Sequence, residues 1–170
     1  EEMHAGTFNI GAIRQGSEHR AWTLQDTGYA TVDVETNFGK SYSLKYSNTA
    51  KGSENMQAAL NPNNRAAKYH GQERLIASEQ VDEAKGWAHR RGLKDIENRP
   101  DVSQAHMETE KYLTGKISDS EGVESKELTI EESKQIAKEA KDGGFDPEKH
   151  GYSKDPLLEE VRIDYINRAM

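Results

Sequence analysis

The sequence predicts an α/β protein of the α+β type, with a small mixed β-sheet that contains a β-hairpin and is flanked by helices, followed by a C-terminal helical region. Two runs of alternating apolar and polar residues meet at a glycine-containing turn, and several amphipathic segments begin at helix-capping residues. Of the 170 residues, 33% are hydrophobic and 31% are charged. Since so low an apolar fraction supplies only a modest core, we expect one compact unit with solvated segments around it.

A β-hairpin over residues 30–46 is the element that the sequence indicates most directly. The apolar members of its two runs are Val32, Val34, Tyr42, Leu44 and Tyr46. Side chains two apart on a strand share a face, so burial of this apolar set turns the intervening residues to a polar face. That polar face carries Asp33, Glu35, Ser43 and Lys45.

The other elements follow from periodicity and from capping residues. The predicted strands are 8–13 and 74–77, and the predicted helices are 17–25, 49–60, 78–91, 103–117, 129–143 and 155–170. Ser17 and Ser78 are the expected N-caps of their helices. Thr129 with Glu132 forms a capping box, in which each side chain bonds the backbone of the other.

The acidic charge lies in the last third of the chain. Residues 1–100 hold 13 basic and 13 acidic residues, whereas residues 101–170 hold 10 and 17, which accounts for the net charge of −7. We therefore expect residues 1–100 to form the α/β core and residues 101–170 an acidic helical extension that continues in a longer native protein. The sequence shows no dominant basic footprint of the kind that strong nucleic-acid binders usually have.

Several classes of protein are excluded by composition. The chain has no cysteine, so it has neither disulfides nor thiolate metal sites. No apolar stretch approaches the length of a membrane span, and residues 1–4 show no features of a signal peptide. The expected location is the cytoplasm, and delivery as an effector by a dedicated system stays open.

The polar face of the hairpin has the composition of a metal-dependent hydrolytic site. Carboxylates such as Asp33 and Glu35 bind Mg²⁺ or Mn²⁺, and a lysine such as Lys45 stabilises charge on a phosphate or orients the attacking water. The competing interpretation is that this face is the solvent side of a sheet, where acid–lysine pairs are common.

The order of elements around this face resembles the core of the PD-(D/E)xK nuclease superfamily. The resemblance covers about residues 8–80, and it implies an acid on one strand, an acid-x-lysine on the next and an acid from the first helix. Asp33, Lys45 and Glu18 match these positions, and Ser43 stands where the family usually has Glu, Asp or Gln. The resemblance implies Glu18 and Asp33 as metal ligands and Asp33 and Lys45 as catalytic residues. Glu35, which shares the polar face with Asp33, is the expected auxiliary metal ligand and catalytic residue in place of the acid missing at Ser43. The run ending in Lys45-Tyr46 is also similar to large uncharacterised bacterial proteins of mobile elements.

The function that this resemblance implies is Mg²⁺-dependent (or Mn²⁺-dependent) hydrolysis of DNA or RNA, with nucleic acid as the partner. Ser43, His70 and Arg74 are then the expected substrate contacts. Two alternatives stay open. One is a catalytically inactive, nuclease-like interaction module that binds a partner protein through its acidic helices. The other is a bacterial toxin or effector domain with different chemistry, such as nucleotidyl or ADP-ribosyl transfer.

Overall fold

The computed structural model describes residues 1–24, 28, 32–143 and 146–169, and it has the predicted α+β fold class. Its helices are α1 (Glu2–Arg14), α2 (Ala50–Gln57), α3 (Val81–Lys94), α4 (Pro100–Tyr112), α5 (Ile130–Gly143) and α6 (Asp155–Ala169), with short 3-10 turns η1 (Ser78–Gln80) and η2 (Pro147–His150). Its strands are β1 (Ala21–Thr23), β2 (Val34–Thr36), β3 (Ser41–Leu44), β4 (Glu73–Leu75) and β5 (Leu113–Thr114). Four positions of the predicted elements lie outside the described residues: Gln25, Ala30, Thr31 and Met170.

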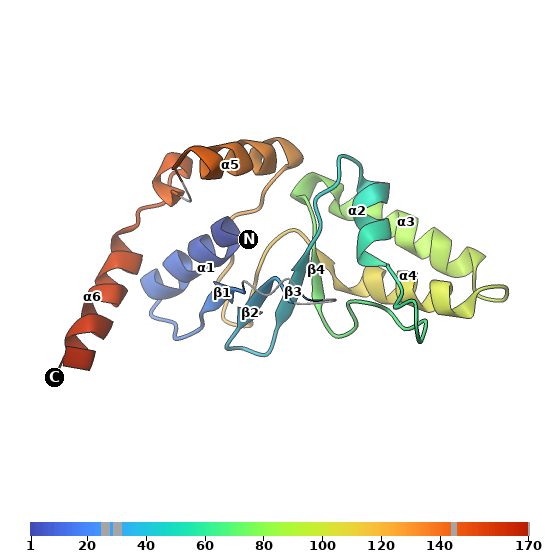
Figure 1. Cartoon of the computed structure of the whole chain (residues 1–170), viewed down its shortest axis with the longest axis horizontal. Helices are drawn as coiled ribbons and strands as arrows, with labels where there is room; N and C mark the ends of the chain where they lie inside the picture. Colours follow the sequence, from blue (N-terminus) through green and yellow to red (C-terminus); the bar gives the residue numbers. More distant parts are fainter. Residues whose placement is uncertain (25–27, 29–31, 144–145, 170) are drawn as a thin grey trace.

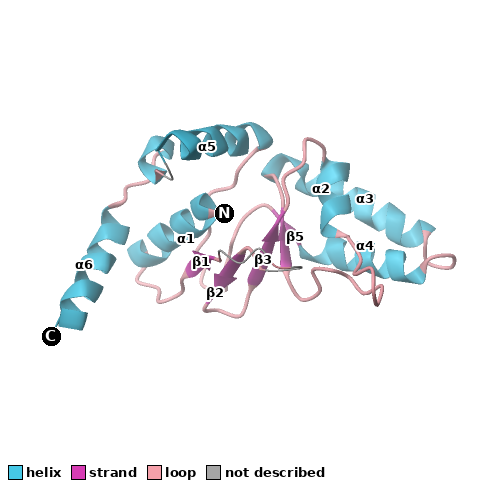
Figure 2. Cartoon of the chain, viewed as in Figure 1, coloured by secondary structure: helices cyan, strands magenta, loops and turns pink. Residues whose placement is uncertain are grey.

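The five strands form one mixed sheet in the order β1-β2-β3-β4-β5 (Figure 1 labels the first four and Figure 2 labels β5). Strands β1, β2 and β3 are antiparallel neighbours, whereas β4 and β5 run parallel to β3. The pairing of Val34 with Tyr42 confirms the predicted hairpin and its register. Helix α2 forms the crossover from β3 to β4, the connection that parallel neighbours require.

Helix α1 covers one face of the sheet. The predicted strand at residues 8–13 was wrong, because these residues belong to this helix. Met3, Thr7 and Ile10 are all buried, at the four- and three-residue spacing of a helix. Phe8 belongs to the core that includes Val34, Tyr42 and Leu75.

Residues 17–24, the described part of the predicted helix 17–25, do not form a helix. The chain from Ser17 to Arg20 is irregular, and Ala21–Thr23 is the edge strand β1. Ser17 does accept a backbone hydrogen bond, from His19 two residues on, which makes a local turn. Pairing of Ala21 with Thr36 supplies sheet hydrogen bonds that a short isolated helix could not match.

Helices α2, α3 and α4 cover the opposite face of the sheet (Figure 2). The core extends beyond the predicted boundary at residue 100. Strand β5 joins the sheet, and Ile117, Val123 and Leu128 are fully or almost fully buried. Residues 101–128 therefore belong to the compact unit.

Helices α5 and α6 lie outside this core, and neither contains a buried residue. The predicted capping box at the start of α5 is confirmed, because Thr129 and Glu132 each accept a hydrogen bond from the other's backbone amide. Figure 1 shows α6 beside α1, consistent with their contacts. Within the described residues, no helix combines the length and apolar character needed to cross a bilayer.

Candidate functional site

Asp33 lies where the hydrogen-bond ladder between β2 and β3 ends. Its backbone amide donates to the Tyr42 carbonyl at 2.9 Å, which is an ordinary ladder bond. At the next step the Leu44 amide donates to the Asp33 carboxylate at 2.8 Å, so the side chain takes the place of a backbone carbonyl. The two strands part at this point, and the carboxylate is held in the opening.

Lys45 follows Leu44 directly, at the same end of the sheet. Its amide donates to the Leu75 carbonyl at 3.0 Å, which ties the backbone to the neighbouring strand β4. Its ammonium group lies 5.2 Å from the centroid of the Tyr69 ring, which is buried. A ring face at that distance attracts a cation and limits where the amine goes.

The acid that a helix contributes to this end of the sheet is Glu1, at the start of α1, and not Glu18. The Glu1 carboxyl interacts electrostatically with Asp33 and Lys45. Partial desolvation raises its pKa, and Asp33 raises it further, whereas the α-amino group and Lys45 lower it. Glu18 precedes β1, and its carbonyl accepts a hydrogen bond from Asn37 at the hairpin turn. It lies at the opposite end of the hairpin from Lys45.

Two further residues of the predicted polar face are engaged elsewhere. One Glu35 carboxylate oxygen accepts from the Ser41 hydroxyl at 2.7 Å and from the Thr36 amide at 3.2 Å. Ser43 is fully buried and donates to the Gln57 side chain at 2.7 Å. Because β3 is paired on both sides and α2 covers this face, Ser43 cannot serve as the predicted substrate contact.

Arg74 is also unavailable to a substrate, because its side chain is completely buried. Its guanidinium donates to Thr109 and forms an ion pair with Glu108 at 2.9 Å. Desolvation lowers its pKa, and the charges of Glu108 and Glu54 oppose that shift. His70 contacts the same Glu108 at 3.0 Å, but from the surface, with 81% of its side chain exposed. Of these predicted substrate contacts only His70 is accessible.

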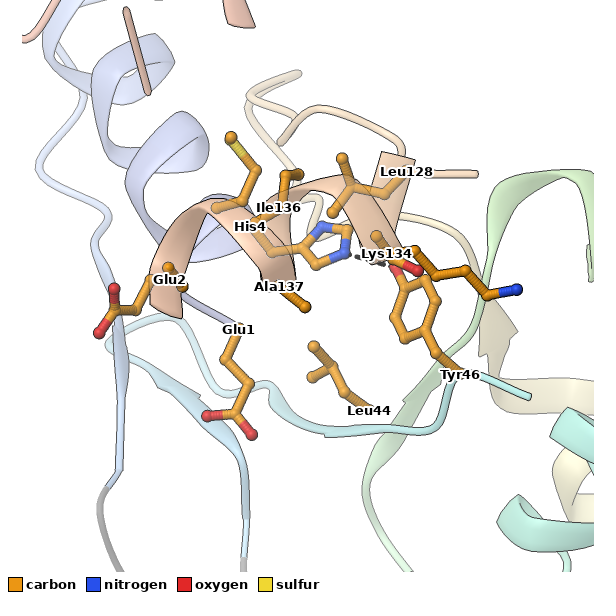
Figure 3. Close-up of a pocket in the computed structure, with 12 residues that line it drawn as sticks. Glu1, Glu2, His4, Leu44, Tyr46, Leu128, Lys134, Ile136 and Ala137 are labelled. Carbon is orange, nitrogen blue, oxygen red and sulfur yellow. Dashed lines mark hydrogen bonds between the residues drawn. The ribbon is translucent and has the colours of Figure 1, made fainter. Parts of the chain in front are cut away.

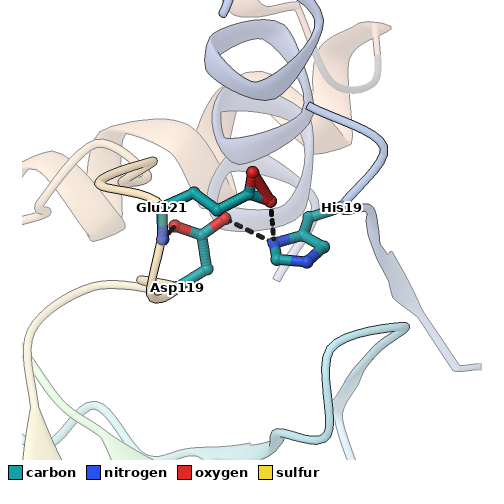
Figure 4. A group of neighbouring side chains, drawn as sticks. All are labelled: His19, Asp119 and Glu121. Atoms are coloured by element: carbon teal, nitrogen blue, oxygen red, sulfur yellow. Dashed lines mark hydrogen bonds and ion pairs between the residues drawn. The ribbon is translucent and has the colours of Figure 1, made fainter. Parts of the chain in front are cut away.

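A second cluster of potential metal ligands lies at the turn end of the hairpin (Figure 4). The His19 Nδ1 atom is 2.7 Å from an oxygen of Asp119 and 3.0 Å from an oxygen of Glu121. Asp119 also accepts from the amides of Glu121 and Val123, and Glu121 accepts from Ser17. These bonds satisfy the cluster without a cation, so its evident role is to fasten the segment before β1 to the loop at 119–123.

Sequence reasoning could not find this cluster, because His19 and Asp119 are 100 residues apart. The carboxylates of Glu1, Asp33 and Glu35 are less tightly grouped than the ligand atoms of His19, Asp119 and Glu121. In the described part of the chain they do not form a comparable group of ligand atoms, all within 4.8 Å of one another.

A cavity of about 650 Å³ opens beside Glu1 (Figure 3). It lies between the start of α1, the end of β3 and the inner side of α5. Its lining residues are Glu1, Glu2, Met3, His4, Leu44, Tyr46, Leu128, Ser133, Lys134, Ile136, Ala137 and Ala140. His4 is fully buried, and its Nε2 atom is hydrogen-bonded to the Tyr46 hydroxyl at 2.7 Å. Burial lowers the pKa of His4 to about 3, so its imidazole is neutral.

Compared with protein-family models, with curated proteins and with solved structures, the chain gives no match. Its function must therefore be argued from its own residues. The end of the hairpin carries the Asp33 carboxylate and the Lys45 amine, and Leu44, whose amide bonds Asp33, lines the cavity together with Glu1. Chemically, such a group can hold a divalent cation and an anionic substrate side by side.

Proposed function

We propose that this chain is a metal-dependent nuclease domain that hydrolyses phosphodiester bonds of DNA or RNA. The observation that supports the proposal is the Asp33 carboxylate at the open end of the β2–β3 ladder, held by the amide of Leu44, the residue before Lys45. The Glu1 carboxyl interacts electrostatically with Asp33 and Lys45. The chain thus offers two acids and a lysine at one end of a sheet, with the acids on different elements.

The donor set fits Mg²⁺ or Mn²⁺, because both ions prefer carboxylate oxygens. Asp33 and Glu1 are the residues that would hold the ion. When bound, it supplies Lewis-acid polarisation of the phosphate and a lowered pKa of a bound water. Asp33 is oriented for this task by the Leu44 amide. Lys45, held over Tyr69, places a positive charge where negative charge develops on the phosphate.

The inactive interaction module is retained as the second candidate because of Ser43. The residue two positions before Lys45 is this serine, whose hydroxyl is buried against Gln57, and it supplies no carboxylate to the site. A divalent cation there has fewer charged ligands than three acids would give. An inactive module would show neither metal binding at Asp33 nor cleavage.

The direct test is cleavage of a supercoiled plasmid and of single-stranded DNA and RNA oligonucleotides with Mg²⁺ or Mn²⁺. We expect wild-type cleavage and a loss of about a hundredfold in Lys45→Ala, the scale expected when one charge-stabilising group is removed. Lys111→Ala is the matched control, since Lys111 also lies over a tyrosine ring, that of Tyr112 on α4. Equal cleavage by wild type and Lys45→Ala would rule out this mechanism.

A further inference from the structure

The cavity beside Glu1 adjoins the proposed cleavage site. Glu1 lines the cavity and interacts with Asp33 and Lys45. Leu44 also lines it, and the Leu44 amide holds the Asp33 carboxylate. A phosphate bound at Asp33 and Lys45 would therefore place the nucleoside attached to it at the cavity mouth.

The chemistry of the lining favours a flat, uncharged ring. Six of the twelve lining residues have apolar, non-aromatic side chains: Met3, Leu44, Leu128, Ile136, Ala137 and Ala140. Figure 3 shows Leu44 and Leu128 on the core side and Ile136 and Ala137 on α5. A sugar–phosphate would lose its hydration in such a space, whereas a base gains from burying its faces. The volume lies within the range of roughly 300–1,000 Å³ that is usual for ligand sites.

Tyr46 supplies an aromatic ring whose position is fixed. Its hydroxyl is bonded to His4, and His4 is itself buried and held by Ser125 at 3.4 Å. A tyrosine fixed in this way loses little conformational entropy when a base stacks on it. The bond from buried His4 thus holds the partly buried Tyr46 ring at the cavity wall, a role that the proposed cleavage chemistry does not require.

Helix α5 forms the outer wall and leaves room for a ligand. None of its residues is buried, although Ile136, Ala137 and Ala140 face inward. The apolar side of α5 therefore borders the cavity and is not packed tightly on the core.

We propose that this cavity binds the base of an unpaired nucleotide next to the phosphate that the domain cleaves. The inference rests on the proposed nuclease function, which places the phosphate at Asp33 and Lys45. A base between α1 and α5 has no space for its paired partner, so the strand must be single or locally opened there. The substrate class is accordingly single-stranded nucleic acid, or a duplex with a displaced nucleotide.

The test measures binding without cleavage. Fluorescence anisotropy in EDTA at low ionic strength compares a short single-stranded oligonucleotide, as DNA and as RNA, with the matching duplex. We expect the single strand to bind about tenfold more tightly, which corresponds to stacking of one base. Ala137→Trp fills the cavity from α5 and should remove this preference. Ala169→Trp adds the same ring to an exposed position of α6 and should leave it unchanged.

A second readout locates the base. The fluorescence of 2-aminopurine in the single strand should be quenched on binding, and Tyr46→Leu should abolish the quenching. Equal affinity for duplex and single strand, or unchanged binding by Ala137→Trp, would overturn the inference. Because these binding measurements need no metal, their outcome is independent of the cleavage assay. Loss of the single-strand preference would contradict the base-binding cavity even if the plasmid is cleaved, and absence of cleavage would contradict the nuclease function even if the single strand binds more tightly. Thermal melting of each variant verifies that it is folded.

Discussion

The carboxylate of Asp33 and the backbone amide of Leu44 are joined by a 2.8 Å hydrogen bond that closes the β2–β3 ladder. The bond fixes the Asp33 carboxylate at the point where the two strands separate. Its donor, Leu44, is the residue directly before Lys45. The bond uses one carboxylate oxygen, Oδ2, as a structural acceptor. An acid that completes a sheet and also belongs to a candidate site can be tested for the two roles separately.

Replacing Asp33 by asparagine or by alanine separates these roles. Asparagine keeps an oxygen that can accept from Leu44, so Asp33→Asn should fold with nearly wild-type stability and yet lose cleavage. Asp33→Ala removes the acceptor and should lower the free energy of unfolding by about 1 kcal/mol as well. Urea unfolding and plasmid cleavage measure the two effects. Full activity in Asp33→Asn would show that the negative charge of Asp33 has no part in the reaction.

Glu1 and Glu18 give opposite expectations for metal binding. Glu1→Gln removes one of the two carboxylates at the end of the hairpin, so Mn²⁺ affinity measured by calorimetry should fall by about tenfold or more, since ligand charge sets divalent affinity. Glu18→Gln is the matched control and should leave it unchanged, because Glu18 lies at the turn end. If Glu18→Gln weakens binding and Glu1→Gln does not, the assignment of the helical acid is wrong.

His4 should make folding sensitive to mild acid. Its folded pKa is about 3, lowered from 6.5 mainly by burial. Between these values the unfolded chain binds a proton at His4 that the folded chain does not, so stability falls as the pH falls through this window. The slope attributable to His4 approaches about 1.4 kcal/mol per pH unit.

The test is to measure the free energy of unfolding of wild type and His4→Gln by chemical denaturation between about pH 6.5 and pH 5. This range lies above the pKa values of most carboxyl groups. Glutamine can still bond the Tyr46 hydroxyl but does not titrate. The variant should therefore show a shallower dependence of unfolding free energy on pH. Parallel curves for the two proteins would mean that His4 is not buried in its neutral form.

Arg74 and His70, which the sequence grouped together, should differ sharply in their effect on stability. Arg74→Met leaves Glu108 and Glu54 without their buried cation and should cost about 3–5 kcal/mol. His70→Ala alters an exposed contact to the same Glu108 and should change stability by no more than about 0.5 kcal/mol. Thermal unfolding distinguishes the two, and a well-tolerated Arg74→Met would contradict the burial of this ion pair.

The sequence by itself determined the elements whose signals are local. Alternation fixed the hairpin and its faces, and the Thr129–Glu132 capping box fixed the start of α5. Local signals failed at residues 8–13 and 17–24. The short apolar run at residues 8–13 fits either a helix or a strand, and only packing against the sheet chooses between them. At Ser17 a cap-like side chain makes a local turn instead of starting a helix.

The tertiary structure alone decided which residues meet. It brought Glu1 to Asp33 and Lys45, moved Glu18 to the far end of the hairpin, and buried Ser43 and Arg74 under the helices that follow. Strand periodicity specifies the face on which a side chain lies, but not whether a distant helix covers that face. That outcome depends on how separate elements bury their apolar surfaces together, which no local pattern encodes.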